Sequence, residues 1–545
     1  MKMVAARRLA AGGLLLVLLG ALPPPAAQMA VAPRLLVVLV VDQMRFDYIE
    51  QMRSRWTHGL KRLVTEGAVF ERNYYPYLQT VTCAGHATIG TGTFPATHGI
   101  ILNAWWRGTR NAPCTEDPTV QAVPYEPGAE VVGHSAVQLL VPTMADRLRA
   151  ASPESRVVSL SIKPRSAIMM AGSGGVVAWT DDHNRWATST AYAAAPDEDV
   201  QAFVAAHPRL AVRAEVWERL LDASRYTGSD AGLGEKPPIG WTARFPHAMA
   251  GTPGTSEEQF YTLWENSPFS DAYLGRMAED LVRRKKLGQR RATDFLGVSF
   301  SALDYVGHKF GPESHEVQDT LLRLDRTIGD LLEALDRLVG PGRYLVGLSA
   351  DHGVAPIPEA RIASGQAGGR IPTLRLMEAA NAALVELLGP GQHVARVEYT
   401  QIYLTPEARQ RVLEDPTIVA PVTAALERVP GVARAMPSAG LERQRTSPDP
   451  LVRAAALSHV PDRSGQIVVI PGPYYVIGGS DATTHGTHQS YDQHVPLIFF
   501  GAGIKPGRYR MPSTPADLAP TLAASIDLEM PGADGEAHTG VFRRR

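Results

Sequence analysis

Leu35-Leu36-Val37-Val38-Leu39-Val40-Val41 forms a continuous apolar run, rich in β-branched valine, that ends directly at Asp42. A strand without polar alternation is buried on both faces, which is typical of a parallel sheet covered by helices. Later runs of the same kind occupy residues 157–162, 295–300, 344–349 and 495–500. Helical periodicity lies between them, most clearly over 317–339. We therefore predict an α/β fold: a doubly wound, mostly parallel sheet with helices on both faces and functional groups at the carboxyl ends of its strands.

Two stretches depart from this alternation. Residues 185–285 are rich in Ala, Trp and Pro, with loop signals among them. Residues 365–475 contain a strand-like segment over 396–404, a helical pattern near 418–429 and a short strand-like segment near 431–434. We interpret both stretches as insertions in one catalytic domain, and the second as an α+β subdomain that lies over the site.

The composition is that of an ordinary soluble globular protein. The 545 residues include 54 basic and 55 acidic side chains, for a formal net charge of -1. A chain without a net basic field has no general attraction for nucleic acid. We expect small-molecule partners, no nucleic acid, and a monomer.

Residues 1–28 have the pattern of a secretory signal peptide. Lys2, Arg7 and Arg8 precede an apolar run over 9–22, and small residues follow it. That run is shorter than the ~20 residues needed to span a bilayer, so an uncleaved membrane anchor is the less favoured alternative. We predict a mature domain over 29–545, no stable membrane insertion, and a periplasmic or secreted location.

Cys83 and Cys114 are the two cysteines of the chain. Two cysteines of an exported protein can pair, so we expect a disulfide, with two free thiols as the alternative. Sequence alone does not show whether their Cα atoms are close enough.

The segment Thr80–Gly92 has the character of a helix start that approaches a ligand. It carries four threonines and three glycines among small residues. A hydroxyl at a helix N-terminus is close to the positive end of the helix dipole, which favours an oxyanion or a phosphate. An ordinary capped turn has the same composition, so a nucleophilic role for Thr82 requires an activating group elsewhere.

Aspartate and histidine side chains follow several of the buried runs. The candidates are Asp42, Asp304, His308, Asp351, His352 and His485. Each alone has a plain structural interpretation, such as a helix cap or a surface turn. Together they match the oxygen and imidazole ligands of a zinc pair, and the set predicts a two-metal hydrolase. A metal-bound threonine hydroxyl loses its proton more easily, which is the activation that Thr82 requires.

Five segments in combination resemble the alkaline phosphatase superfamily, closest to its PafA-type branch of monoesterases with a threonine nucleophile. The segments lie at residues 40–47, 82–88, 304–308, 350–353 and 484–488. The resemblance covers nearly the whole mature chain. It implies two zinc ions per chain and hydrolysis of phosphate monoesters through a covalent phosphothreonine at Thr82.

The resemblance also assigns ligands. One zinc would be held by Asp304, His308 and His485, and the other by Asp42, Asp351 and His352 with Thr82 joining it. His485 is preferred to His488 because the family segment carries a His-Gly pair. His86 is interpreted as a structural residue of the helix.

In the same branch an asparagine and a Lys-x-Arg pair contact the phosphoryl oxygens. Here they would be Asn103, Lys163 and Arg165. A monoester dianion carries more charge than a diester, so extra cations at its oxygens favour the monoester. A solvated strand end is the plain alternative for Lys163 and Arg165.

Four other functions fit parts of the sequence less well. A nucleotide pyrophosphatase/phosphodiesterase shares the metal set and the threonine but should lack the Lys-x-Arg pair. A sulfatase needs Cys or Ser followed by x-Pro-x-Arg, which does not follow Cys83. A cofactor-independent phosphoglycerate mutase would use serine in the cytoplasm. A non-catalytic zinc-binding protein with a decayed site is disfavoured because no ligand of the set is missing.

Overall fold

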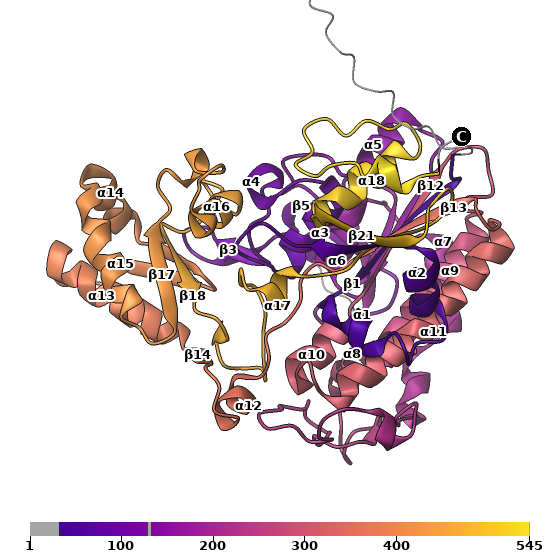
Figure 1. The fold of residues 1–545 in the computed structure, drawn as a ribbon, viewed down its shortest axis with the longest axis horizontal. Coiled ribbons are helices and arrows are strands. Elements are labelled where there is room, and N and C mark those ends of the chain that lie inside the picture. The colour runs from indigo at the N-terminus through magenta and orange to yellow at the C-terminus, as the bar shows by residue number, and fades with distance from the viewer. Residues whose placement is uncertain (1–31, 129–131, 544–545) are drawn as a thin grey trace, which may run out of the picture.

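β1 (Leu35–Val41) lies in the middle of an 11-stranded sheet (Figure 1). The computed structural model describes residues 32–128 and 132–543, so the predicted signal peptide at 1–28 lies outside the described residues. β1 pairs in parallel with β12 (Asp294–Phe300) on one side and with β13 (Tyr344–Ser349) on the other. The predicted α/β fold class is confirmed.

The strand order is β21-β2-β20-β13-β1-β12-β7-β8-β9-β5-β6. The outer strands are β2 (Ala68–Asn73), β5 (Glu116–Pro124), β6 (Val132–His134), β7 (Val157–Ser161), β8 (Val176–Thr180), β9 (Trp186–Ser189), β20 (Leu497–Gly501) and β21 (Gly507–Ser513). The sheet is parallel from β13 to β8, and antiparallel pairs flank this centre. The strand predicted at 495–500 is present as β20, but it runs antiparallel to β13, so its carboxyl end lies at the opposite edge.

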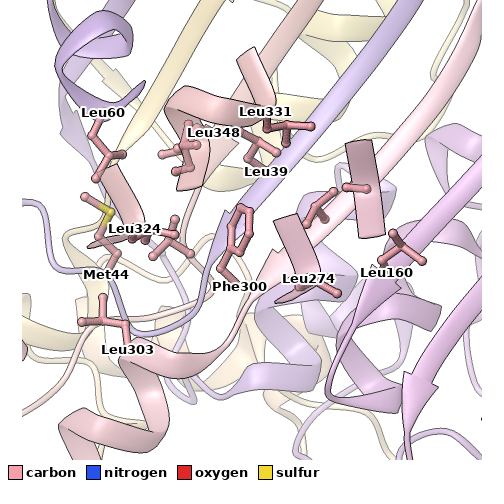
Figure 2. Packing of buried hydrophobic residues seen from close by; sticks show 14 of the residues in the cluster. Leu39, Met44, Leu60, Leu160, Leu274, Phe300, Leu303, Leu324, Leu331 and Leu348 are labelled. Atoms are coloured by element: carbon pink, nitrogen blue, oxygen red, sulfur yellow. The ribbon is translucent and has the colours of Figure 1, made fainter. Parts of the chain in front are cut away.

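β1 contributes side chains to two separate cores because successive residues of a strand point to opposite faces. Its odd-numbered residues pack with α2 (Gly59–Glu66), α9 (Pro268–Arg284) and α11 (His315–Leu338). Figure 2 shows Leu39 of β1 in this core, together with Phe300 and Leu348 of its neighbours. Burial of each such side chain stabilises the fold by roughly 1.5–3 kcal/mol.

The even-numbered residues of β1 pack into the core on the other face of the sheet. That core includes residues of α3 (Thr82–Thr91), α6 (Pro164–Ala171) and α18 (Leu518–Ala524). Burial on both faces is the reason that the strand sequence has no polar alternation. α3, which carries Thr82, is thereby fixed against the sheet that carries the predicted ligands.

A second, four-stranded sheet has the order β15-β16-β18-β17 and lies beside the main body (Figure 1, orange). Its strands are β15 (Val394–Glu398), β16 (Gln401–Leu404), β17 (Val432–Pro437) and β18 (Ile467–Pro471). α13 (Thr373–Leu388) and α15 (Val419–Glu427) pack on it around their own buried cluster. The single strand predicted over 396–404 is wrong: the segment is a hairpin that turns at Tyr399, whose φ is 55°.

The other departing stretch, 185–285, forms several small elements and three helices that contribute to the main core. They include α7 (Glu198–Ala206), α8 (Glu257–Glu265) and a short ribbon of β10 (Val216–Trp217) with β11 (His247–Ala248). The end of the stretch is α9, which contributes Leu274 and Leu281 to the main core. Within the described part of the chain, no helix has the length and apolar character that a bilayer crossing needs.

A disulfide joins Cys83 and Cys114, whose Cα atoms are 6.7 Å apart. Cys83 lies in the first turn of α3, and Cys114 follows β4 (Asn111–Pro113). The backbone N–H of Cys114 donates to the carbonyl of Asn103. The expected disulfide is present, and it ties the start of α3 to the segment that carries Asn103.

Candidate active site

The carboxyl ends of β1, β12 and β13 bring the predicted ligands together. Asp42 follows β1, Asp351 and His352 follow β13, and Asp304 lies in the first turn of α10 (Ala302–Phe310) directly after β12. These strands are parallel neighbours, so their ends lie at one edge of the sheet. His485 reaches the same place from the loop before α17 (Ser490–Gln493).

Two groups of buried ligand atoms lie at this edge. The first group is Asp304, His352 and His485, and the second is Asp42, Asp351 and His352; within each group the atoms lie within 4.8 Å of one another. His352 belongs to both groups, and its ring stacks on that of His485 with centroids 3.4 Å apart. His308 Nε2 lies 3.2 Å from Asp304 Oδ1. The structure thus brings together all six Asp and His residues of the predicted set.

The three histidines all present the same nitrogen to the site. Nδ1 of His308, His352 and His485 lies 2.9 Å from the backbone carbonyl of Thr483, Gly353 and Thr80, respectively. A hydrogen bond at Nδ1 fixes the tautomer and leaves Nε2 free as a ligand. This orientation is the one that a metal site requires.

Two buried carboxylate oxygens at the site form no hydrogen bond within the described residues, although His86 Nδ1 lies 3.2 Å from one of them, Asp351 Oδ2. Asp42 Oδ1 and Asp351 Oδ2 are buried and have no hydrogen-bond partner among residues 32–128 and 132–543. They lie 3.4 Å and 3.3 Å from His352 Nε2. Buried polar atoms in proteins are nearly always satisfied, so this pair fits a cation that both oxygens and the imidazole would share.

The buried site holds more acidic than basic side chains. Burial first, and then the charges of Asp304 and Asp351, raise the pKa of Asp42 well above its usual range. Burial opposes the ionised form of Asp304, but Lys163 and His308 hold the pKa of that carboxyl well below its usual range. Three buried carboxylates face one lysine, so cations are the expected complement.

Thr82 is the first residue of α3, a helix of 10 residues that are all buried. Its Oγ1 lies 3.4 Å from His352 Nε2, the ring shared by both ligand groups. α3 comes this close because it has glycine at Gly85, where a Cβ would lie 2.3 Å from the carbonyl oxygen of Asp351. The nucleophile candidate therefore lies at a helix N-terminus beside the predicted second metal site.

Of the predicted substrate-binding residues, Asn103 contacts the residue next to Thr82, and Lys163 contacts two of the predicted metal ligands. Asn103 Oδ1 accepts a hydrogen bond of 2.8 Å from the backbone N–H of Cys83, next to Thr82. Lys163 is buried, and its Nζ donates to Asp42 Oδ2 and Asp304 Oδ2 at 2.5 Å each. Arg165 is half-buried in the first turn of α6, and its Nε has no hydrogen-bond partner in the described part of the chain.

The two other histidines considered from sequence lie outside both ligand groups. His86 Nδ1 lies 2.9 Å from the carbonyl of Thr82, and its Nε2 lies 2.8 Å from Ser299 Oγ. His86 Nδ1 also lies 3.2 Å from Oδ2 of the predicted ligand Asp351, so the ring contacts the site as well as its own helix. His488 is half-buried, and its Nε2 contacts the side chain of Gln489.

Sequence reasoning missed Gln43, which contacts two of the predicted ligands. Its side chain and its backbone N–H donate to Asp304 and Asp351. The available signal was a polar residue directly after Asp42 at the end of a fully apolar strand, and amides are not themselves expected zinc ligands.

The main sheet and the two ligand groups define an alkaline-phosphatase-like α/β protein with a candidate two-metal site. The chain belongs to the family described as type I phosphodiesterase / nucleotide pyrophosphatase, whose model matches residues 36–494. The resemblance to the alkaline phosphatase superfamily is confirmed.

Individual relatives align along almost the full length of the chain. "Alkaline phosphatase PafA" of Elizabethkingia meningoseptica is 33% identical over 537 residues, 94% of this chain and 95% of that protein. A protein named "Calcium-transporting ATPase" from Myroides odoratus is 33% identical over 522 residues, 92% of this chain and 93% of that protein. The crystal structure of wild-type alkaline phosphatase PafA superposes with a TM-score of 0.87 at 32% identity, over 94% of this chain and 100% of that one.

Proposed function

We propose that the chain is an exported two-zinc alkaline phosphatase that hydrolyses phosphate monoesters through a covalent phosphothreonine at Thr82. The observation that carries the proposal is the position of Thr82 Oγ1, at the N-terminus of α3 and 3.4 Å from His352 Nε2. Full-length relatives named alkaline phosphatase support phosphoric monoester hydrolysis. Export rests on the sequence pattern of residues 1–28.

The donor set supports zinc at both sites. One ion would be held by Asp304, His485 and His308, whose Nε2 lies 3.2 Å from Asp304 Oδ1, and the other by Asp42, Asp351, His352 and Thr82. His352, which belongs to both ligand groups, is thereby assigned to the second ion. Each bound zinc would supply Lewis-acid stabilisation of a phosphoryl oxygen and lower the pKa of a bound hydroxyl. The oriented Nε2 atoms and the unpaired oxygens of Asp42 and Asp351 are the features of this chain that fit such ions.

The reaction would then take place in two steps, phosphoryl transfer to Thr82 and hydrolysis of the phosphothreonine. Thr82 Oγ gives up its proton to solvent and attacks phosphorus, the bond to the ester oxygen breaks, and the leaving alkoxide takes a proton from solvent to become the alcohol. A water molecule next attacks the phosphorus of the phosphothreonine, which restores the Thr82 hydroxyl and releases inorganic phosphate. The N-terminus of α3 stabilises the negative charge that develops on the phosphoryl group.

Asn103, Lys163 and Arg165 would hold the phosphoryl oxygens. Asn103 is positioned by the Cys83 N–H next to the nucleophile, and Arg165 has an unpaired Nε in the described structure. An ammonium group has three donors, so Lys163 can keep a carboxylate contact while it donates to a substrate oxygen. Cations at this position favour the doubly charged monoester over a diester.

The test compares an aryl phosphate with a bis-aryl phosphate and measures zinc in the same sample. We expect a higher kcat/KM for the monoester, two zinc ions per chain, and loss of nearly all turnover in Thr82→Ala. Thr82→Ser keeps a hydroxyl and should retain part of the activity. Wild-type turnover by Thr82→Ala would overturn the nucleophile assignment.

A phosphodiesterase is the second candidate because the family description names that activity. A higher kcat/KM for the bis-aryl phosphate would support it. Truncation of Lys163 and Arg165 would then affect both substrates equally, whereas a monoesterase should lose mainly its monoester activity.

A further inference from the structure

Gln43 is a buried polar residue in the turn that follows β1. Its φ is 69°, and its side chain is 1% exposed. A positive φ is unfavourable for a residue with a side chain and persists only where the surrounding contacts hold it in place. Such an outlier directly after the predicted ligand Asp42 points to a role at the site.

The contacts of Gln43 connect the two predicted ligand groups. Its Nε2 donates to Asp304 Oδ1 at 2.6 Å, and its backbone N–H donates to Asp351 Oδ1 at 3.1 Å. Asp304 belongs to the first group and Asp351 to the second. One residue therefore contacts a carboxylate of each group, from the strand that lies between them.

The α10 helix is shaped to receive this side chain. A Cβ at Gly307 would lie 1.8 Å from Gln43 Oε1 and 3.0 Å from its Cδ. Gly307 lies inside a regular helix, so its backbone conformation does not call for glycine. Glycine is required at position 307, between the predicted ligands Asp304 and His308, because a side chain there would collide with Gln43.

We propose that Gln43 is a positioning residue that sets the spacing between the two metal sites through Asp304 and Asp351. The proposal rests on the two-zinc function proposed above. Hydrogen bonds to ligating carboxylates fix their orientation, and loss of such a partner typically lowers metal affinity ~10–100-fold. The contact to Asp351 uses the backbone, so truncation of the side chain should weaken mainly the site of Asp304, His308 and His485.

The experiment is a zinc titration of the metal-free full-length protein by calorimetry, with metal content measured independently. The proteins are wild type, Gln43→Ala, Gly307→Ala and the double variant. We expect Gln43→Ala to weaken one of the two zinc sites ~10–100-fold. Gly307→Ala should weaken the same site, because its methyl group displaces the Gln43 side chain.

The double variant tests the mechanism. Once Gln43 is truncated the Gly307→Ala methyl has room, so it should add little further loss, and the two effects should not sum. The proposal would be overturned if both single variants bound two zinc ions with wild-type affinity. It would also be overturned if the loss of zinc affinity in the double variant equalled the sum of the losses in the two single variants.

Two controls keep the outcomes separate. Gln43→Gly keeps the N–H contact and tolerates the positive φ, so it should show the same weakened site without backbone strain. Circular dichroism of the metal-free variants checks that each is folded. Fewer than two zinc ions on wild type would reject the proposed function itself, whereas two ions with no effect at Gln43 would reject only this inference.

Discussion

Lys163 lies between two carboxylates that are predicted ligands of different zinc ions. Its Nζ donates to Asp42 and Asp304 within a fully buried site. Burial works against a charged lysine, but Asp304 and Asp42 outweigh it and raise the pKa of the ammonium above its usual value. Lys163 therefore has a structural role, since its positive charge stabilises two buried carboxylates, in addition to its proposed role in substrate binding.

We expect Lys163→Met to destabilise the metal-free protein by about 3–5 kcal/mol, because the carboxylates lose their buried counter-charge. Added zinc should raise the Tm of this variant more than that of wild type, since the ions then supply the missing charge. Thermal melts with and without zinc measure both effects. Lys309→Met is the control, because Lys309 pairs with a partly exposed Asp481 and should change Tm little. An equal zinc response in both variants would contradict the expectation.

At the scale of elements, the site depends on how closely α3 approaches the end of β13. Gly85 lies against the backbone of Asp351, and Gly90 lies against the carbonyl of Met169 in α6. Both contacts are with backbone atoms, which cannot move aside as a flexible side chain can. The glycines of this helix therefore set the distance between Thr82 and the ligands.

We expect Gly85→Ala to lower the free energy of unfolding by about 1–3 kcal/mol through overpacking. It should also displace Thr82 and so lower kcat more than the loss of stability explains. Gly479→Ala is the matched control, because no atom of the described residues lies within 4 Å of its added Cβ. Denaturant unfolding and steady-state kinetics measure the two effects. An active, fully stable Gly85→Ala protein would show that α3 is free to shift.

The strands and the ligand set could be predicted from sequence for a physical reason. Fully buried parallel strands have no polar alternation, and a chemically distinct Asp follows each of the three strands β1, β12 and β13. The direction of β20 could not be predicted, because a strand buried on both faces has the same apolar composition whether it runs parallel or antiparallel to its neighbours. The hairpin at 396–404 was missed because its turn uses Tyr399, not the glycine or asparagine that marks such turns. Gln43 was missed because its role lies wholly in tertiary contacts.

At the scale of the whole molecule, a buried acid-imidazole pair joins the 216–248 segment to α11. His247 Nε2 and Glu316 Oε1 are 2.9 Å apart, and both side chains are fully buried. Burial raises the pKa of Glu316 to about 8 and lowers the pKa of His247 to about 4. Both groups are thus uncharged over the range between these values, and the hydrogen bond joins two neutral partners.

This pair predicts how stability depends on pH. The raised pKa of Glu316 contributes stability that is fully present below 4.5 and is lost as the pH rises towards about 8. The lowered pKa of His247 contributes stability that is lost as the pH falls from 6.5 through about 4. The alkaline loss amounts to at most ~1.4 kcal/mol per pH unit.

We expect the Tm of Glu316→Gln to fall less than that of wild type between about pH 5 and pH 8, because the amide does not ionise. The comparison uses the difference between the two proteins, so contributions of other titrating groups cancel. Melting curves across this range provide the measurement. If Tm changed with pH in the same way in both proteins, ionisation of Glu316 would not be the cause of the stability lost as the pH rises.

The hairpin tip of the small sheet touches the loop that carries His485. A Cβ at Gly486, whose φ is 105°, would lie 2.5 Å from the ring of Tyr399, and Gln79 donates to Thr400 beside it. Position 486 therefore excludes a side chain twice, through the ring of Tyr399 and through its own φ. Among descendants of a common ancestor, a smaller residue at 399 should not be enough to admit a side chain at 486. Even a lineage that lost the small sheet should keep glycine at 486, which a comparison of related sequences can test.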